Sequence, residues 1–211
     1  MPADWNADNP NDLPVIQSNL RQILLQILKE APERSLPTAA LAQGWHRRIY
    51  QGVRLPVDYF AGEIRDSDSR FPELFGYEVI VGGHAGVASW EVPSELAHFE
   101  AGLQQAVSSL DRIIPVGVRP LGTAELHAVL TLCAFAHGEW VRIHPFANGN
   151  GGTARLWANW CAVRYRLPAF IRLKPRPDSL GYAAAAARSM TGDHLPMVAE
   201  LVAMLRGRLR K

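Results

Sequence analysis

The sequence predicts an all-α fold, a helical bundle that carries one small β-hairpin. Apolar residues recur at helical spacing through most of the chain, and only one segment has clear strand character. The 211 residues, of which 48% are hydrophobic, suffice for one well-filled core. We expect residues 1–14, rich in Asp, Asn and Pro, to form a flexible arm, and residues 15–211 to form a single helical domain.

Helical periodicity is clearest where apolar residues recur every three or four positions. In residues 17–30, Leu20, Ile23 and Ile27 share one face, and Pro32 ends this helix. Residues 123–140 form the longest apolar helical stretch and are expected to lie at the centre. The remaining predicted helices span residues 38–52, 94–109 (with Ser94 as its cap), 151–166, 179–190 and 195–210.

Residues 57–93 differ from the rest because they contain many Gly and Pro residues. The stretch YEVIV at residues 77–81 has the β-branched and aromatic composition of a strand, and two glycines follow it directly. We therefore expect a hairpin or extended flap in this segment. Its expected residues are Tyr77, Glu78, Val79, Ile80, Val81 and Gly82.

Composition excludes several classes of protein. Lys and Arg total 22 and Asp and Glu total 20, so no basic excess indicates a nucleic-acid partner. The first residues carry no signal-peptide pattern, and no apolar stretch is long enough to cross a bilayer. Cys133 and Cys161 lie in apolar helical stretches and are expected to be buried. These observations predict a cytoplasmic protein with no nucleic-acid and no membrane partner.

The stretch VRIHPFANGNGGTAR, residues 141–155, carries the strongest functional signal. Consecutive glycines at the start of a helix leave backbone N–H groups free to face an anion, and the helix dipole favours negative charge there. Arg155 lies one turn into the same helix, and helical side chains lean toward the N-terminus. Its guanidinium is therefore expected to reach back to the same anion.

His144 stands at the other edge of this loop. Its ordinary pKa lies near neutrality, so it can accept a proton from a hydroxyl. Asn150 is expected to hold or orient a phosphate oxygen. Each residue alone is more simply interpreted as structural, but their combination within a dozen positions favours transfer of a phosphorus-containing group to a hydroxyl.

The stretch HPFANGNGGTAR resembles the signature of the Fic family, which is His-Pro-Phe, any residue, an acid, Gly-Asn-Gly-Arg, two residues and Arg. The flanking stretches HGEWVRIHPF and LWANWCAVRYRLPAF are similar to the family as well, and the resemblance covers about residues 40–206. It implies a Fic-type helical bundle with a β-hairpin flap. It also implies a protein adenylyltransferase (AMPylator) that transfers AMP from ATP to a Ser, Thr or Tyr hydroxyl of a target protein.

The resemblance assigns roles by position. His144 would be the catalytic base, and the flap would pair with an extended stretch of the target. Asn148 would take the place of the acid that helps hold Mg²⁺, with the ion bound mainly through the phosphates. Binding of the nucleotide and its phosphates would fall to Asn148, Gly149, Asn150, Gly151, Gly152 and Arg155.

Two positions depart from the signature. Asn148 carries no charge where the family has an acid, and Gly152 replaces the first arginine. Loss of one charge-assisted hydrogen bond to phosphate weakens binding by about tenfold to a hundredfold. Arg142 is a nearby cation that would substitute. Two alternatives therefore stay open: a catalytically impaired Fic-fold binding or regulatory protein, and a Fic enzyme that uses another phosphate-containing donor.

The sequence also bears on regulation of the protein and on its remaining polar residues. The family's inhibitory motif, Ser or Thr, three residues, Glu and then Gly or Asn, is absent from the sequence, so restraint would come from a separate antitoxin-like protein. His137 is expected to form a helix-end hydrogen bond, His84 to be exposed on the flap, and the tryptophans to pack in the core or at an interface. A solvated charged loop is predicted for Glu63, Arg65, Asp66 and Asp68.

Overall fold

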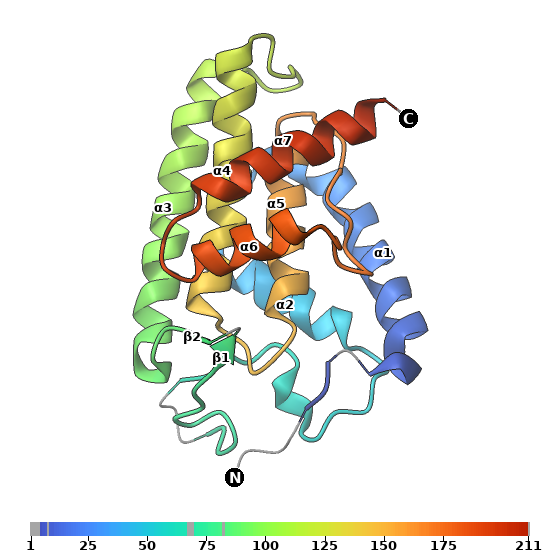
Figure 1. The fold of residues 1–211 in the computed structure, drawn as a ribbon, viewed down its shortest axis with the longest axis vertical. Helices are drawn as coiled ribbons and strands as arrows, with labels where there is room; N and C mark the ends of the chain where they lie inside the picture. The colour runs from blue at the N-terminus through green and yellow to red at the C-terminus, as the bar shows by residue number, and fades with distance from the viewer. Residues whose placement is uncertain (1–4, 8, 67–69, 82, 211) are drawn as a thin grey trace.

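The computed structural model describes residues 5–7, 9–66, 70–81 and 83–210, and these residues form the predicted helical bundle (Figure 1). The all-α prediction is confirmed, with one two-stranded sheet beside the helices. The helices are α1 (Leu13–Glu30), α2 (Ala39–Ile49), α3 (Val92–Ile113), α4 (Thr123–Ile143), α5 (Asn150–Arg164), α6 (Leu180–Ser189) and α7 (Leu195–Leu209).

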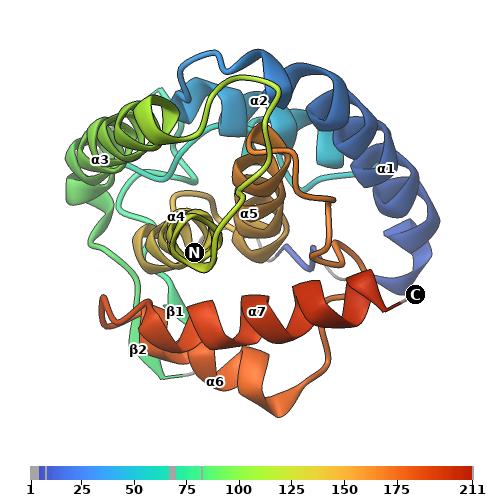
Figure 2. The same ribbon diagram turned by 90° about the horizontal axis from the view of Figure 1, so that it is seen from above.

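Helices α4 and α5 lie at the centre, and the other helices surround them (Figure 2). Every residue of α5 from Thr153 to Arg164 is buried, because other elements pack against all of its faces. Helix α4 is also buried over most of its last three turns, as expected for the longest apolar stretch. The loop between these two helices therefore starts and ends on deeply buried helices.

Aromatic side chains fill the space around the two central helices. Trp157 of α5 packs against Trp45 at a ring separation of 4.9 Å, against Phe99 at 5.6 Å and against Trp140 at 6.0 Å. Such contacts join α2, α3, α4 and α5 into one core. The core packing predicted for the tryptophans is confirmed for these three, whereas Trp90 is 66% exposed in the 3₁₀ turn Ser89–Glu91 before α3.

Two helices begin at least two positions earlier than the sequence predicts. Helix α1 begins at Leu13 and α3 begins at Val92, and each has a proline, Pro14 or Pro93, in its first turn. A proline fits there because the first helical N–H groups have no partner within the helix. Ser94 is thus not the cap but lies inside α3, where its hydroxyl donates to the Glu91 carbonyl.

The predicted strand at residues 77–81 is shorter in the structure. Only β1 (Ile80–Val81) is a strand, and it pairs antiparallel with β2 (His84–Ala85). Tyr77 does not pair with the other leg, since its carbonyl accepts a hydrogen bond from the side chain of Arg65, whereas the carbonyl of Val79 still accepts from Gly86. Gly82 of the predicted flap lies outside the described residues.

Part of the N-terminal arm packs on the domain, which differs from the expected flexible arm. Trp5 and Ala7 are buried, and the Trp5 ring lies 4.7 Å from Tyr50 and 5.6 Å from Phe60. A short 3₁₀ turn, Pro10–Asp12, then leads into α1. The sequence did not predict this packing because residues 1–14 are mostly polar. One buried tryptophan nevertheless contributes about as much apolar area as several smaller residues.

The remaining expectations about sequence class concern membranes and thiols. None of the helices in the described ranges combines the length and hydropathy needed to span a bilayer. Cys133 and Cys161 are buried free thiols, as predicted. Burial raises the pKa of the Cys161 thiol to about 12, so it stays protonated and unreactive at neutral pH.

We predict that Trp157→Ala destabilises the protein by about 3–5 kcal/mol, because it leaves a large cavity where α2, α3, α4 and α5 meet. The control is Leu180→Ala, since Leu180 is 90% exposed, and it should change stability by less than about 0.5 kcal/mol. Urea denaturation of both variants measures the difference. Equal stabilities for the two variants would contradict the placement of Trp157 in the core.

Candidate functional site

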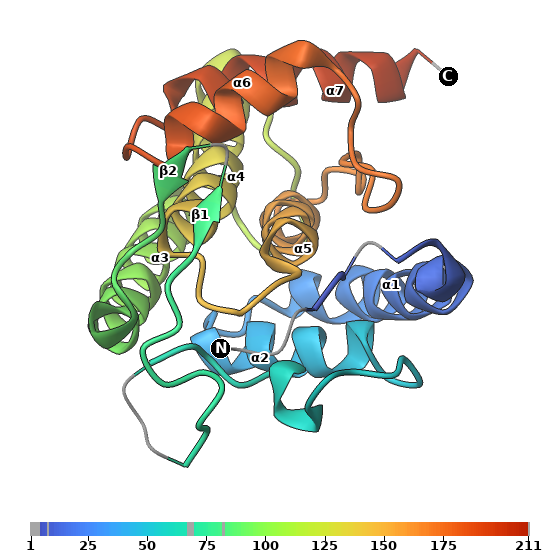
Figure 3. The same ribbon diagram turned by 60° about the horizontal axis from the view of Figure 1, so that its bottom comes forward.

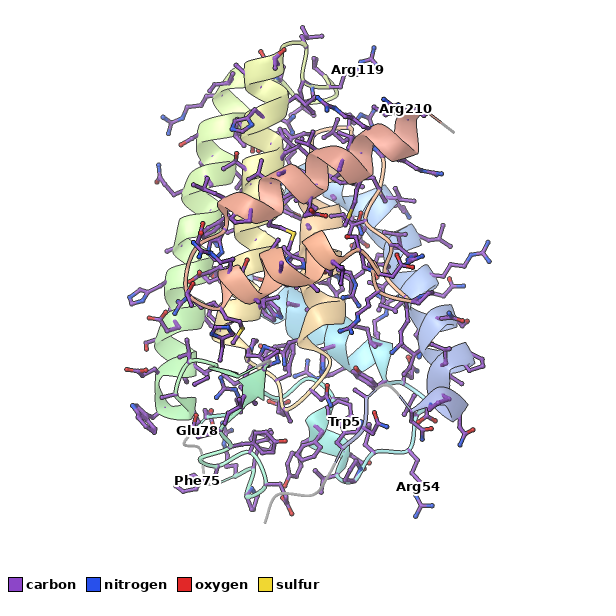
Figure 4. The ribbon with its side chains drawn as sticks, in the orientation of Figure 1. Trp5, Arg54, Phe75, Glu78, Arg119 and Arg210 are labelled. Carbon is purple, nitrogen blue, oxygen red and sulfur yellow. The ribbon has the colours of Figure 1, made fainter. Side chains whose placement is uncertain are left out.

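The loop from His144 to Gly149 lies at one end of the bundle, between the hairpin and the N-terminal segment (Figure 3). Phe75, Glu78 and Trp5 are at the same end, whereas Arg119 and Arg210 are at the opposite end (Figure 4). The fold thus gathers the signature loop, the flap and the anchored arm around one site. Each of these three segments contributes residues to the site.

His144 is held in an orientation suited to proton transfer. It follows α4 in the left-handed region, with φ of 53°, and its Nδ1 lies 3.0 Å from the carbonyl of Val141. The carbonyl can only accept, so Nδ1 carries the proton and Nε2 has a free lone pair. Burial lowers the pKa of His144 to about 4; the Val141 hydrogen bond opposes this shift and the charge of Arg65 adds to it. The ring is neutral at pH 7 and can act as a base.

Asn150 closes the loop that follows His144. Its Oδ1 accepts from the backbone N–H of Phe146 at 2.9 Å, and its Nδ2 donates to the carbonyl of Phe146 at 2.8 Å. The side chain is buried, and both ends of the amide are occupied. The side chain of Asn150 therefore fixes the shape of the loop.

Gly149 is the residue at which the loop turns into α5. Its φ is 77°, and a Cβ there would lie 2.3 Å from Tyr50 Oη and 2.8 Å from His46 Nε2. Only glycine satisfies both the left-handed backbone and this close approach. The requirement agrees with the predicted place of Gly149 in the loop, although it arises from packing rather than from a ligand.

His46 supports the loop from α2 and was not singled out from the sequence. Its Nε2 donates to the carbonyl of Asn148 at 3.0 Å, its Nδ1 accepts from the N–H of Gly62 at 2.9 Å, and its ring stacks 3.8 Å from Phe146. Burial lowers the pKa of His46 to about 3, which the Asn148 hydrogen bond partly offsets, so the ring is neutral. The only signal for it was a histidine on the apolar face of a predicted helix.

The start of α5 offers hydrogen-bond donors to an anion. The N–H groups of Gly152 and Thr153 turn back to the carbonyl of Gly149, whereas those of Asn150 and Gly151 make no hydrogen bond within the described residues. Two donors therefore point outward at the positive end of the helix dipole. Free N–H groups at a helix start are suited to an anion.

Arg155 faces this helix start, as its position predicts. Its Nη1 lies 3.3 Å from the place that a Cβ on Gly151 would occupy, and its Nε donates to the carbonyl of Leu173 at 2.9 Å. The side chain is only 8% exposed. The Leu173 contact fixes the direction of the guanidinium and leaves its outer N–H groups near the two free donors of α5.

Both ends of the Asn148 side-chain amide make hydrogen bonds. Its Nδ2 donates to the carbonyl of Trp5 and its Oδ1 accepts from the N–H of Gly149, each at 2.8 Å. Both ends of the amide are thus used, and among the described residues no three His, Cys, Asp or Glu side chains gather as metal ligands. Binding of Mg²⁺ mainly through the nucleotide's phosphates, with Asn148 beside them, stays a prediction.

Gly152 stands where the family has its first arginine, and Arg142 is the nearby cation that was expected to take its place. A Cβ on Gly152 would meet no atom within 4 Å, so the position is open. The expectation that Arg142 would substitute is wrong, because its guanidinium is held by Glu139 at 2.6 Å and also by Glu95. Among the described residues, Arg155 is the arginine whose guanidinium lies beside the start of α5.

The exposure predicted from the sequence is furthest from the structure at Arg65. It was predicted to lie in a solvated loop with Glu63, Asp66 and Asp68, yet it is fully buried. Its guanidinium donates to carbonyls on both sides of the site, at His144 (2.6 Å) and Tyr77 (3.2 Å) among them. Glu63 fits the surface prediction better, since it pairs with Arg47, and Asp68 lies outside the described residues.

The flap residues divide into a tethered base and an exposed tip. Glu78 accepts hydrogen bonds from the N–H and hydroxyl of Ser89, and the Val79 carbonyl accepts from Gly86. A Cβ on Gly86 would lie 3.3 Å from the Cβ of His144, so the flap's base touches the candidate catalytic residue. Ile80 is 77% exposed at the tip, where a partner strand can approach β1.

The two other histidines noted in the sequence stand apart from the anion site. His137 lies inside α4 rather than at its end, where its Nε2 and the hydroxyl of Tyr182 are 2.7 Å apart. Burial lowers the pKa of His137 to about 3, so it is a neutral hydrogen-bonding residue of the core. His84 lies on β2 and is partly exposed.

Comparison with known proteins supports the resemblance noted above. Residues 36–162 match the model of the Fic/DOC family. The chain is 31% identical over 126 residues to "Protein adenylyltransferase Fic" of Aedes aegypti, a match that covers 60% of this chain. It spans only 19% of the length of that relative.

Solved structures share the fold at low sequence identity. A Fic-domain-containing signalling protein of Bacteroides thetaiotaomicron superposes with a TM-score of 0.67 and 19% identity, over 96% of this chain and 71% of that chain. The BepC protein of Bartonella tribocorum, a VirB-translocated effector solved with bound AMPPNP, gives a TM-score of 0.56 and 16% identity, over 90% and 85%.

We predict that acidification destabilises the protein through its buried histidines. Burial lowers the pKa values of His46, His137 and His144 to about 3, 3 and 4, from an ordinary value of 6.5. Below pH 6.5 the unfolded chain thus binds more protons, and the free energy of unfolding falls by up to about 1.4 kcal/mol per pH unit for each histidine. Urea denaturation at pH 7 and pH 5 measures the loss.

The variant His46→Gln should make this pH dependence shallower, because it removes one of the three buried rings. An NMR titration should place the midpoint of His144 near pH 4. A midpoint near 6.5 would mean that the ring is solvated and not held as described.

Proposed function

The chain belongs to the Fic/DOC family, and we propose that it transfers AMP from ATP to a Ser, Thr or Tyr hydroxyl of a target protein. One observation carries this proposal: a neutral histidine with a free Nε2 stands at one edge of a loop whose other edge offers free N–H donors and an arginine. A base beside an anion site is what phosphoryl-group transfer to a hydroxyl requires. The name of the Aedes relative and the AMPPNP bound to BepC favour an adenine nucleotide as donor.

The proposed step is an in-line displacement at phosphorus. The target hydroxyl oxygen bonds to the α-phosphorus of ATP while Nε2 of His144 takes the hydroxyl proton. The bond between the α-phosphorus and the oxygen bridging to the β-phosphate breaks, and pyrophosphate leaves with that electron pair. The products are AMP joined to the target through a phosphodiester, pyrophosphate, and a protonated His144 whose low pKa favours release of the proton to water.

The phosphates would be held mainly by backbone groups. The free N–H groups of Asn150 and Gly151 and the guanidinium of Arg155 supply charge-assisted hydrogen bonds. Gly151 suits this role because a larger residue would press on Arg155. Magnesium, if it accompanies ATP, would be bound by the nucleotide's phosphates rather than by Asn148, and no step above depends on it.

The target would bind by adding a strand to the flap. Strand β1 pairs with β2 on one edge and has no partner on the other among the described residues. Backbone hydrogen bonds to Ile80 and Val81 would hold an extended target segment without strong sequence preference. Because the base of the flap contacts His144, a segment held there would lie close to the base.

Two observations favour a second candidate, a Fic-fold protein that binds partners with little or no catalysis. Gly152 leaves the place of the family's first arginine empty, and Asn148 is engaged by Trp5. AMP transfer that depends on His144 would exclude this candidate. If ATP is inactive, a panel of GTP, UTP and CDP-choline tests another donor. A separate inhibitory protein would be sought by co-purification with the active chain.

We predict that His144→Ala reduces AMP transfer by about 10²- to 10⁴-fold, because no other group in the described part of the chain is placed to take the hydroxyl proton. Incorporation of ATP labelled at the α-phosphate into protein measures it. His98→Ala, whose side chain is 77% exposed on α3, is the matched control and should transfer AMP at close to the normal rate. Equal labelling by the native chain and His144→Ala would contradict the mechanism.

We predict that Arg155→Ala weakens ATP binding by about tenfold to a hundredfold, the value of one or two charge-assisted hydrogen bonds. Gly152→Arg should strengthen it, because the new side chain enters open space beside the helix start. Calorimetry with ATP and Mg²⁺ measures both. The control is Arg188→Ala, since Arg188 pairs with Asp193 on the surface. Unchanged affinity in Arg155→Ala would show that the loop is not the phosphate site.

A further inference from the structure

We propose that Arg65 is a positioning residue that fixes the flap in place against the His144 loop. The inference rests on the proposed function, since it concerns how a target strand on the flap reaches the base. Arg65 was expected in a solvated loop, yet it is fully buried at the junction between the two segments. Its role would be to set the distance between the flap and His144 rather than to contact ATP or the target.

One side of the guanidinium binds the end of α4. Nε donates to the carbonyl of His144 at 2.6 Å, and Nη2 donates to the carbonyl of Ile143 at 2.8 Å. The backbone N–H of Arg65 also donates to the carbonyl of Pro145 at 2.8 Å. Three consecutive carbonyls around the candidate base are therefore satisfied by one residue, and a cation at a helix C-terminus is further favoured by the helix dipole.

The other side of the guanidinium binds both legs of the hairpin. Nη1 donates to the carbonyl of Tyr77, before β1, at 3.2 Å, and Nη2 donates to the carbonyl of Val87, after β2, at 2.5 Å. Glu78 on the same hairpin lies 3.6 Å from Nη1 and balances part of the charge. Both legs are therefore held at their base, while the tip at Ile80 stays exposed.

The geometry requires a guanidinium in particular. Carbonyls of residues 77, 87, 143 and 144 converge on a planar fork with fixed donor directions, which the ammonium of lysine cannot reproduce. Gly86 adds a steric reason for the fit, because a Cβ there would lie 3.0 Å from Nη2 of Arg65 and 3.3 Å from the Cβ of His144. Arg65, Gly86 and His144 thus form one packed junction.

The positive charge of Arg65 also affects the pKa of His144. The charge of Arg65 is one of the causes that keep the pKa of His144 low, after burial. Loss of the charge should raise that pKa, whereas loss of the fork geometry alone should not. Lysine and methionine at residue 65 separate the two effects, because lysine keeps the charge and methionine keeps only the length.

The test compares Arg65→Lys and Arg65→Met with Arg164→Lys. Arg164 is the matched control: it is equally buried, donates to the carbonyls of Arg34 and Ser35 and pairs with Asp111, but it lies away from the loop. Hydrogen exchange of amides in residues 77–88 reports the flap, and NMR titration reports His144. Neither measurement requires enzymatic activity.

We expect Arg65→Lys to accelerate exchange of the Gly86 amide by about tenfold or more, the equivalent of one lost charge-assisted hydrogen bond. Arg65→Met should do the same and also shift the His144 midpoint upward. Arg164→Lys should lose stability without either change. In the native chain the Nε–H of Arg65 should exchange slowly, which tests the contacts even if a variant does not fold.

Transfer and binding assays then separate this inference from the proposed function. With active native protein, Arg65→Lys should lower kcat for a protein target at least about tenfold while ATP affinity stays unchanged. If the native chain transfers no AMP, slow hydrogen exchange of the flap amides that depends on Arg65 still supports the positioning role of Arg65. The inference is overturned if Arg65→Lys and Arg164→Lys change flap exchange equally, or if the Arg65 Nε–H of the native chain exchanges rapidly.

Discussion

The two hydrogen bonds between the Asn150 amide and the backbone of Phe146 are the constraint on which the site depends. They close the turn between the two central helices within four residues. This closure seats Phe146 between His46 and Trp140 in the core and leaves the first N–H groups of α5 facing outward. Without it, neither the left-handed Gly149 nor the direction of α5 would be fixed, and the donors would not converge.

Burial around this turn sets the charges of its neighbours. His46 and His144 are neutral because the charged ring would lose its hydration, and each ring is aligned by a backbone carbonyl. Arg65 stays charged because the ends of α4 and the hairpin supply several carbonyl acceptors and Glu78. A neutral base and a buried cation thus lie side by side, an arrangement that keeps His144 ready to accept a proton.

Local patterns in the sequence predicted the helices and the signature loop because their determinants lie within a few residues. Periodicity located the helices to within a few positions, and the order of His144, Gly149 and Arg155 indicated the anion site. Long-range partners could not be predicted in this way. Asn148 binds Trp5 and Arg65 binds His144, contacts that join residues 143 and 79 positions apart in the chain. A polar composition at both places indicated exposure, whereas the fold buries them.

The departures at Asn148 and Gly152 therefore have different physical meanings. Asn148 exchanges a charge for a contact that ties the N-terminal segment to the loop, so its amide is structural. Gly152 leaves open space, so the site has lost a side chain without gaining a contact. The family's chemistry would then depend more heavily on backbone donors and on Arg155, as the geometry at the start of α5 indicates.

The most direct test of this central claim is an NMR titration of backbone amides with AMPPNP. If the start of α5 is a preformed phosphate site, the amide signals of Asn150 and Gly151 should shift on binding, and that of Gly207 in α7 should not. The same shifts should be weaker in Arg155→Ala at equal ligand concentration. Shifts confined to residues away from the loop, or none at ligand concentrations up to the millimolar range, would contradict the claim.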